Sequence, residues 1–350
     1  MTDRILGPRA LNRALLARQL LLARSSLSIP DAIEQVGGLQ TQYAPSGYVG
    51  LWSRLRDLDR AALTAALEDR TVIQATLMRT TIHMVSRREF WRYALGVRGP
   101  RRRWALRIPG FVADEASMID AAARLREALA DGPRTVKELG SLGAGFVGNL
   151  GLWVDLVRVP PSGTWERRRA DRLALAEDWV GQPDATEDEG LTHLVRAYLR
   201  AFGPASWRDI ASWAGLTATD AKRGAEGLDL QHYRDADGRG PVDLADAPLP
   251  DTDTPAPVRF LPHWDANLLV HARRTGILPE PYRPRIFSNR NPFSVGVYLV
   301  DGVVAGAWSV KDERVVLDPF EALPARDRRA VEREREALEA FHAGARPHRR

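Results

Sequence analysis

Apolar residues recur every three to four positions through the N-terminal part of the chain, which predicts short amphipathic helices. Ser28 suits an N-cap with Pro30 in the first turn, and a glycine pair ends the same helix, since glycine adopts the left-handed conformation freely. The helices are expected over 10–22, from Ser28 to the glycines at 37–38, over 48–55 and over 58–67. Two β-branched runs, 72–77 and 80–85, then predict strands, as in a winged helix.

Two later segments, 131–139 and 202–210, both begin with a Gly-Pro turn that leads into a short helix. Each follows an amphipathic helix, predicted over 119–129 and 191–202 respectively. The first segment continues into an apolar run over 152–159, a tight turn and a series of arginines, which is typical of a strand followed by a basic wing. Three related units in one chain indicate an internal repeat of winged helices.

The C-terminal part follows a stretch rich in aspartate, proline and alanine at 238–257, which predicts a linker. Asp301-Gly302 lies between two apolar runs and predicts a hairpin turn. The strands are expected over 258–261, 293–300, 303–310 and 314–317, and we expect them to form a small β-barrel or a curled sheet. A charged helix over 324–341 carries Val331, Leu338 and Phe341 on one face and should pack on the rest of the protein.

The predicted fold is therefore α+β, with three tandem winged-helix units and a C-terminal small β-barrel-like domain. The chain is long enough for several such units around a sizeable core. We expect the units to cover 1–115, 116–190, 191–250 (with the linker) and 251–350, the last including the C-terminal helix.

The composition favours a polyanionic partner, because the 350 residues carry a formal net charge of +5. Nearly all of the basic residues are arginines, which bind phosphates and nucleobase edges well. GC-rich codon usage is the plainer cause of this excess of arginine. The sequence has no cysteine, which excludes disulfides, thiolate catalysis and cysteine-based zinc sites. With no membrane-length apolar run and no secretory signal, we expect a cytoplasmic protein that does not bind membranes.

Two glutamines, Gln40 and Gln42, stand just past the predicted helix stop at 37–38. Residues two apart share one face of an extended chain, so both side chains should point at the same place. Two amides aimed together can hold a water or read a base edge, but neither can ionise. The alternative is a pair of glutamines in an ordinary polar loop, since short motifs often match by chance.

This pattern resembles the AlkZ/YcaQ family of bacterial DNA glycosylases, whose signature is glutamine, an aliphatic residue, then glutamine or aspartate. The double-glutamine form marks its AlkZ-like branch, and here Thr41 replaces the aliphatic residue. Threonine has the β-branched shape of valine, while its hydroxyl bears on the substrate pocket. The resemblance extends in order over most of the chain, through the segments 76–85, 259–265, 268–271 and 299–308.

The resemblance implies a monofunctional DNA glycosylase that hydrolyses the N-glycosidic bond of bulky or cross-linked N7-alkylpurines in double-stranded DNA. A purine alkylated at N7 is already cationic and leaves without an acid, so a positioned water can suffice. We expect Gln40 and Gln42 to be catalytic by holding that water jointly, in a monomer without cofactor, metal or carboxylate nucleophile. The family also uses a β-hairpin that probes DNA, for which Asp301-Gly302 is a candidate turn.

The expected DNA contacts are basic residues near the glutamines and in the arginine-rich segments. Arg79 and His83 lie four apart in a strand context and should point the same way, to DNA or into structural hydrogen bonds. The cluster that begins at Arg98 has no acid beside it in sequence, which favours a phosphate clamp over a solvated loop. The expected DNA-binding residues are Arg79, His83, Arg98, Arg101, Arg102, Arg103, Arg107, Arg167, Arg168 and Arg169.

Other functions remain possible from the residues alone. Tandem winged helices also serve regulators without catalysis, although the candidate recognition segment 217–223 has few base-reading side chains. An inactive or narrowed glycosylase is a further possibility, given Thr41. His263, Asp265 and His271 could suggest a metal site, but their spacing fits no metal motif and a hydrogen-bonded structural corner is favoured.

Overall fold

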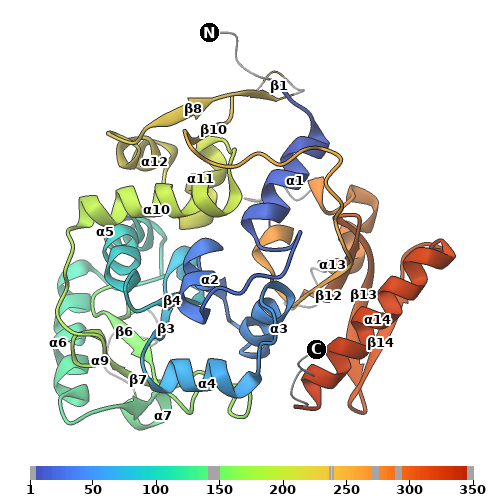
Figure 1. Ribbon diagram of the computed structural model, residues 1–350. Coiled ribbons are helices and arrows are strands. Elements are labelled where there is room, and N and C mark those ends of the chain that lie inside the picture. Colours follow the sequence, from blue (N-terminus) through green and yellow to red (C-terminus); the bar gives the residue numbers. More distant parts are fainter. Residues whose placement is uncertain are drawn as a thin grey trace.

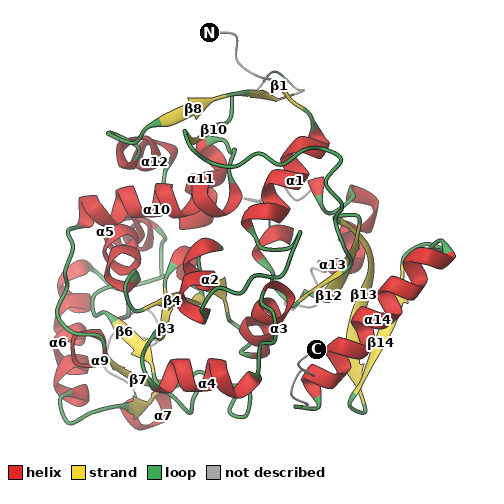
Figure 2. Cartoon of the chain, viewed as in Figure 1, coloured by secondary structure: helices red, strands yellow, loops and turns green. Residues whose placement is uncertain are grey.

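A six-stranded antiparallel sheet lies at the centre of the protein and carries the glutamine motif at one edge (Figures 1 and 2). The computed structural model describes residues 5–140, 150–235, 238, 240–269, 276–287 and 294–344. The central strands, in sheet order, are β2 (Leu39–Gln40), β4 (Ile82–Ser86), β3 (Val72–Thr76), β6 (Leu156–Arg158), β7 (Arg172–Leu175) and β5 (Arg134–Thr135). Strands from the first two predicted units therefore form one continuous sheet, joined where β3 pairs with β6.

The N-terminal helices follow the predicted apolar periodicity. Ser28 caps the second helix by accepting a hydrogen bond from the Asp31 amide at 3.3 Å, and Gly37 and Gly38 end it with φ of +77° and +80°. This confirms the predicted helix stop. These helices are α1 (Pro8–Arg18), α2 (Ile29–Gln35), α3 (Pro45–Arg54) and α4 (Arg60–Glu68), with the 3-10 turn η1 (Met78–Thr80) between β3 and β4.

One long helix, α5 (Phe90–Arg107), was not predicted as a helix. Gly96, Gly99 and Pro100 interrupt its pattern, and these residues normally weaken or end a helix. Gly96 packs so closely on Gly190 of α10 that an added Cβ would lie 2.4 Å from its carbonyl oxygen, so tertiary packing selects the helix. The helices that follow are α6 (Glu115–Leu129), α7 (Val136–Leu139), α9 (Ala176–Trp179), α10 (Glu187–Phe202), α11 (Trp207–Ala214) and α12 (Ala218–Gly224).

The predicted linker is wrong in part, because it contains a strand that belongs to the core. Strand β10 (Val242–Leu244) pairs with β8 (Leu230–His232), and β1 (Ile5–Leu6) pairs with β9 (Arg234–Asp235). Asp243 is fully buried because its carboxylate pairs with Arg18 of α1 at 2.7 Å. The aspartate that suggested a linker in sequence is therefore a buried anchor in the structure.

The C-terminal strands form an open sheet in the described residues, so the predicted barrel is wrong. Their order is β11 (Arg259–Leu261), β12 (Gly296–Val300), β13 (Val303–Lys311) and β14 (Arg314–Pro319), all antiparallel. Helix α14 (Ala325–His342) packs along this sheet through buried Val331, Leu338 and Phe341, as predicted (Figure 1). The short helices η2 (Ala266–Leu268), η5 (Glu280–Tyr282) and α13 (Arg283–Ile286) lie between β11 and β12 in the chain.

The domain boundaries remain a prediction, although the central sheet crosses the first of them at residue 115. No helix in the described ranges is long and apolar enough to cross a membrane.

Candidate active site around the Gln-x-Gln motif

The two glutamines lie where β2 ends at the edge of the central sheet. Gln40 is the last residue of the strand and pairs in register with His83 of β4, while Gln42 lies in the segment that leads to α3. The Gln40 side chain is partly buried and that of Gln42 is exposed. The two residues therefore differ in how far they reach toward solvent.

Hydrogen-bond donors fix the orientation of both amides. The Arg79 guanidinium donates to Gln40 Oε1 at 2.8 Å, and the Ile82 backbone amide donates to Gln42 Oε1 at 3.2 Å. Neither donor can accept, so each glutamine must present its carbonyl oxygen to it. A carbonyl oxygen has two lone pairs, so each retains one with which to accept a hydrogen bond from water.

Thr41, between the glutamines, is buried and directs its hydroxyl into the protein. Gln74 of β3 donates its amide to Thr41 Oγ1 at 3.1 Å, and Thr41 donates its own backbone amide to Ile82. The hydroxyl thus satisfies a buried polar partner and has no place in the wall of the cavity described below. This polar pair takes the place of an aliphatic contact.

Arg79 lies in η1, where a left-handed backbone (φ +52°) turns the chain between β3 and β4. It is therefore not in a strand, as the sequence had indicated. Besides Gln40, its guanidinium donates to the Trp213 carbonyl of α11. Burial lowers the pKa of Arg79 to about 10, which leaves it charged at neutral pH. Arg79 thus ties the motif to a helix of the third predicted unit.

His83 is buried, with 2% of its surface exposed, so it does not reach DNA in this arrangement. This corrects the expected DNA contact, because β4 is flanked by β2 and β3 and its side chains are covered on both faces. His83 Nδ1 lies 2.9 Å from the Thr81 carbonyl. Burial and the nearby Arg79 charge lower the pKa of His83 to about 3, which keeps the ring neutral.

A cavity of about 570 Å³ opens beside Gln42, between the central sheet, α5 and the wing after β6. This volume is in the range of small-molecule sites. Apolar side chains such as Phe111 and Leu173 form part of its wall. The polar side chains in its wall are Gln42, Thr76, Thr80, Arg101, Arg158, Arg168, Arg169 and Asp171.

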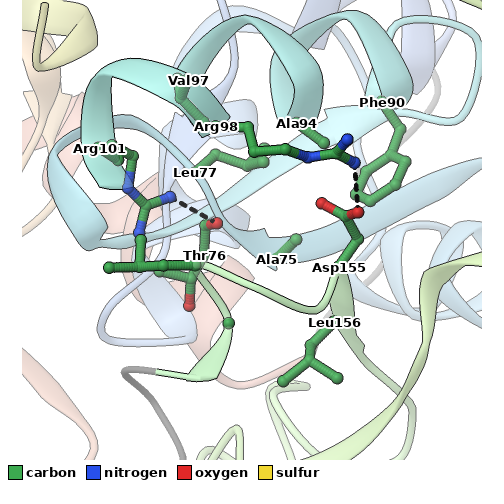
Figure 3. A pocket seen from close by; sticks show the side chains of 12 residues that line it. Ala75, Thr76, Leu77, Phe90, Ala94, Val97, Arg98, Arg101, Asp155 and Leu156 are labelled. Atoms are coloured by element: carbon green, nitrogen blue, oxygen red, sulfur yellow. Dashed lines mark hydrogen bonds and ion pairs between the residues drawn. The ribbon is translucent and has the colours of Figure 1, made fainter. Parts of the chain in front are cut away.

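The arginine cluster lies on α5, and acids from elsewhere in the fold neutralise part of it. Arg98 pairs with Asp155, as Figure 3 shows, and Arg103 pairs with Asp220 of α12 at 3.1 Å. The expectation of a cluster without acids is therefore wrong, because these partners are distant in sequence. Arg102 donates to the Leu152 carbonyl at 2.6 Å, which makes it a structural contact as well.

Three other expected DNA contacts lie in the exposed wing. Arg168 donates to the Tyr43 hydroxyl at 3.1 Å, next to Gln42, while Arg169 pairs with Asp171 at 2.9 Å. Arg167 is exposed, as is Arg107 at the end of α5. These four side chains are available at the surface and stay candidates for DNA contact.

Arg158 was missed by the sequence analysis, although it lies in the cavity wall with Gln42. A signal was present: it stands on β6 between the apolar residues Val157 and Val159, where a charge is unexpected. Its Nε donates to the Ala170 carbonyl at 3.1 Å, and burial lowers its pKa to about 10.

The possible metal ligands are occupied with other partners. Asp265 accepts hydrogen bonds from Arg54 and Asn267, and His263 Nδ1 contacts the Ser294 carbonyl. His271 lies outside the described residues. Within the described ranges, no group of three or more histidine, aspartate or glutamate side chains could hold a metal.

The candidate probing turn at Asp301-Gly302 packs against α1. Arg13 and Arg9 both pair with Asp301, and Asn12 donates to the Gly302 carbonyl at 2.9 Å. This packing anchors the turn to α1, although Asp301 itself is exposed.

Comparison with known proteins places the chain in a family. The model of the family described as DNA glycosylase AlkZ-like matches residues 33–341. The chain belongs to the AlkZ-like DNA glycosylase family. Its reaction class is accordingly the hydrolysis of N-glycosidic bonds in DNA.

Two comparisons with Streptomyces sahachiroi proteins agree. The chain is 24% identical to the interstrand DNA cross-link repair glycosylase of this organism, over 91% of each sequence. The solved structure of S. sahachiroi DNA glycosylase AlkZ superposes with a TM-score of 0.78 at 22% identity, covering 97% of this chain and 98% of that one. At this identity the structural match establishes the shared fold.

Proposed function

We propose that this protein is a monofunctional DNA glycosylase that removes bulky or cross-linked N7-alkylpurines from double-stranded DNA. The observation that carries the proposal is Gln42, whose amide oxygen is fixed by Ile82 in the wall of an arginine-lined cavity. The cross-link repair glycosylase of S. sahachiroi, similar over 91% of both chains, supports this lesion class.

The proposed hydrolysis requires little more than a positioned water molecule. An N7-alkylpurine departs as a neutral base from a cationic adduct, through an oxocarbenium-like state at the sugar. A water with its lone pair aimed at the sugar carbon then completes hydrolysis, and its orientation can supply several kcal/mol of the barrier. Of the described residues in the cavity wall, only Asp171 is a carboxylate, and it pairs with Arg169. The proposal therefore uses no carboxylate nucleophile, metal or cofactor.

The two glutamines have different parts in this proposal. Gln42, exposed at the cavity, accepts a hydrogen bond from the water with the free lone pair of its oxygen. Gln40 accepts from Arg79 and is not in the cavity wall, so in this proposal its remaining lone pair acts together with Gln42 on the water. Arg107, Arg167, Arg168 and Arg169 would bind the DNA backbone.

We also propose that the fold uses winged helices. The order α6, β5, α7, β6, β7, with the three strands in one sheet, supports one such unit. The order α10, α11, α12, β8, β10 supports another, in which α12 would be the third helix. The first unit, which carries the motif, includes α2, α3, β3 and β4.

The test is excision from duplex DNA that carries one N7-methylguanine or a nitrogen-mustard cross-link, followed by alkaline cleavage of abasic sites. Wild type should release the alkylated base and so give strand breaks after the alkali treatment. Gln40→Ala with Gln42→Ala should lose at least about 100-fold in excision rate, because the water loses both acceptors. Binding of undamaged duplex should change less than about twofold. An active double variant would contradict the assignment of the glutamines, and an inactive wild type would contradict the substrate class.

A DNA-binding regulator is the alternative that the same assay examines. It would bind tightly to a preferred sequence and release no base. The helix α12 supports this alternative poorly, because its Asp220 is held by Arg103 and its Ala221 is buried.

A further inference from the structure

The wall of the cavity beside Gln42 contains two arginines, Arg101 and Arg158, that form no ion pair with any described carboxylate. Arg101 is 5% exposed and donates to the Thr76 carbonyl at 3.2 Å, as Figure 3 shows, while Arg158 donates to the Ala170 carbonyl. Among the described residues, neither forms an ion pair. Their neighbours differ, since Arg98 is bound to Asp155 and Arg169 to Asp171.

Arg101 is buried, whereas Arg158 is partly exposed in the wall of the cavity. A buried charge without a partner is costly, whereas a carbonyl oxygen compensates it only in part. Burial lowers the pKa of Arg101 and of Arg158 to about 10, so both remain charged at neutral pH. Both side chains lie in the wall of the cavity beside Gln42, where a ligand can reach them.

The charge indicates which part of damaged DNA can enter. An N7-alkylpurine is cationic, and its departure leaves positive charge on the sugar, so a cavity lined by Arg101, Arg158 and Arg168 would repel both. A phosphodiester has the opposite charge and matches the forked donors of arginine. With Gln42 in the same wall, a phosphate held here would place the adjoining sugar near the water.

We propose that this cavity is a phosphodiester site in which Arg101 and Arg158 bind a phosphate of the damaged strand next to the lesion. The site rests on the proposed function for its substrate, but its binding can be measured without catalysis. Arg158 is in this proposal a DNA-binding residue rather than part of a structural ion pair.

The experiment uses a duplex with one tetrahydrofuran abasic analogue, which is uncharged at the lesion and cannot be cleaved. Arg158→Gln should weaken binding about tenfold and reduce the slope of log affinity against log salt by about one. Arg328→Gln is the matched control, because it removes the same charge from an exposed position on α14 and should change affinity less than about twofold. Equal effects of the two substitutions would overturn the site.

Thermal unfolding without DNA separates a binding role from a structural one. Arg158 has no ion pair to lose, so the Tm of Arg158→Gln should be equal to or above that of wild type. A lower Tm would assign Arg158 to the structure and overturn the proposal. If Arg158→Gln does not fold, Arg158→Lys decides, since retained charge should keep the salt slope while the forked contact is lost. A changed slope in that variant would count against the site.

Inorganic phosphate provides a third measurement that needs no DNA. Phosphate should raise the Tm of wild type more than chloride does at the same ionic strength, and the difference should disappear in Arg158→Gln. An equal rise in both proteins would overturn the site. If no alkylated duplex is cut by wild type, the proposed function fails, but these binding results still decide the phosphate site.

Discussion

Two sets of arginines in this protein have different partners. Arg18 and Arg54, on α1 and α3, pair with the buried carboxylates of Asp243 and Asp265 at 2.7 and 3.0 Å. Arg101 and Arg158, beside Gln42, donate only to backbone carbonyls. The first set connects segments that are far apart in the chain, while the second presents charge to a cavity. The first set therefore holds the fold together, whereas we propose that the second set binds phosphate.

The largest effect is expected from breaking a paired site. Arg18→Met should lower the free energy of unfolding by about 3–5 kcal/mol, because it leaves Asp243 buried and unpaired. Chemical denaturation measures this loss, and Arg18→Met with Asp243→Leu should recover part of it. Arg88→Gln is the exposed control and should lose less than about 1 kcal/mol, although Arg88 pairs with Asp31 and Glu34. Equal losses at Arg18 and Arg88 would remove the basis of the comparison.

A neutral hydrogen-bonded pair should also lose stability when one partner is removed, but by less than a buried ion pair does. Thr41→Val leaves the buried amide of Gln74 without its partner at 3.1 Å, which should cost about 1–3 kcal/mol in unfolding free energy. Thr41→Val with Gln74→Leu removes both partners and should restore much of that stability. A double variant that is less stable than Thr41→Val alone would show that Gln74 is held by its other contacts, such as the Gly163 carbonyl.

His83 is buried without an ionic partner, so the free energy of unfolding should depend on pH. The change per pH unit should be smaller than the effects above. Its pKa of about 3 lies below the ordinary value of 6.5, so the unfolded chain takes up a proton first as the pH falls. Stability should therefore decrease below about pH 6.5, by about 1.4 kcal/mol per pH unit, until the pH approaches 3. His83→Gln should reduce this slope in denaturation series, whereas the exposed His232→Gln should not. An unchanged slope in His83→Gln would show that the ring is not held neutral.

Much of the local structure was predictable because its causes are local. The Ser28 cap begins α2 and the glycines at 37–38 end it, each through contacts within a few residues. The apolar face of α14 likewise follows from its own periodicity. Helix α5 was missed because Gly96 and Pro100 oppose a helix, and only packing against α10 outweighs them.

The sequence by itself determined many of the helices and strands, the family resemblance and the position of Gln40 and Gln42 after a helix stop. The tertiary structure decided which charges are neutralised, since Arg18 meets its partner 225 residues away. It also decided that His83 is covered, that Arg158 lies with Gln42 and that the C-terminal sheet is open. The physical reason is that periodicity and caps act between neighbours in the chain. Burial and ion pairing depend on residues that only the fold brings together.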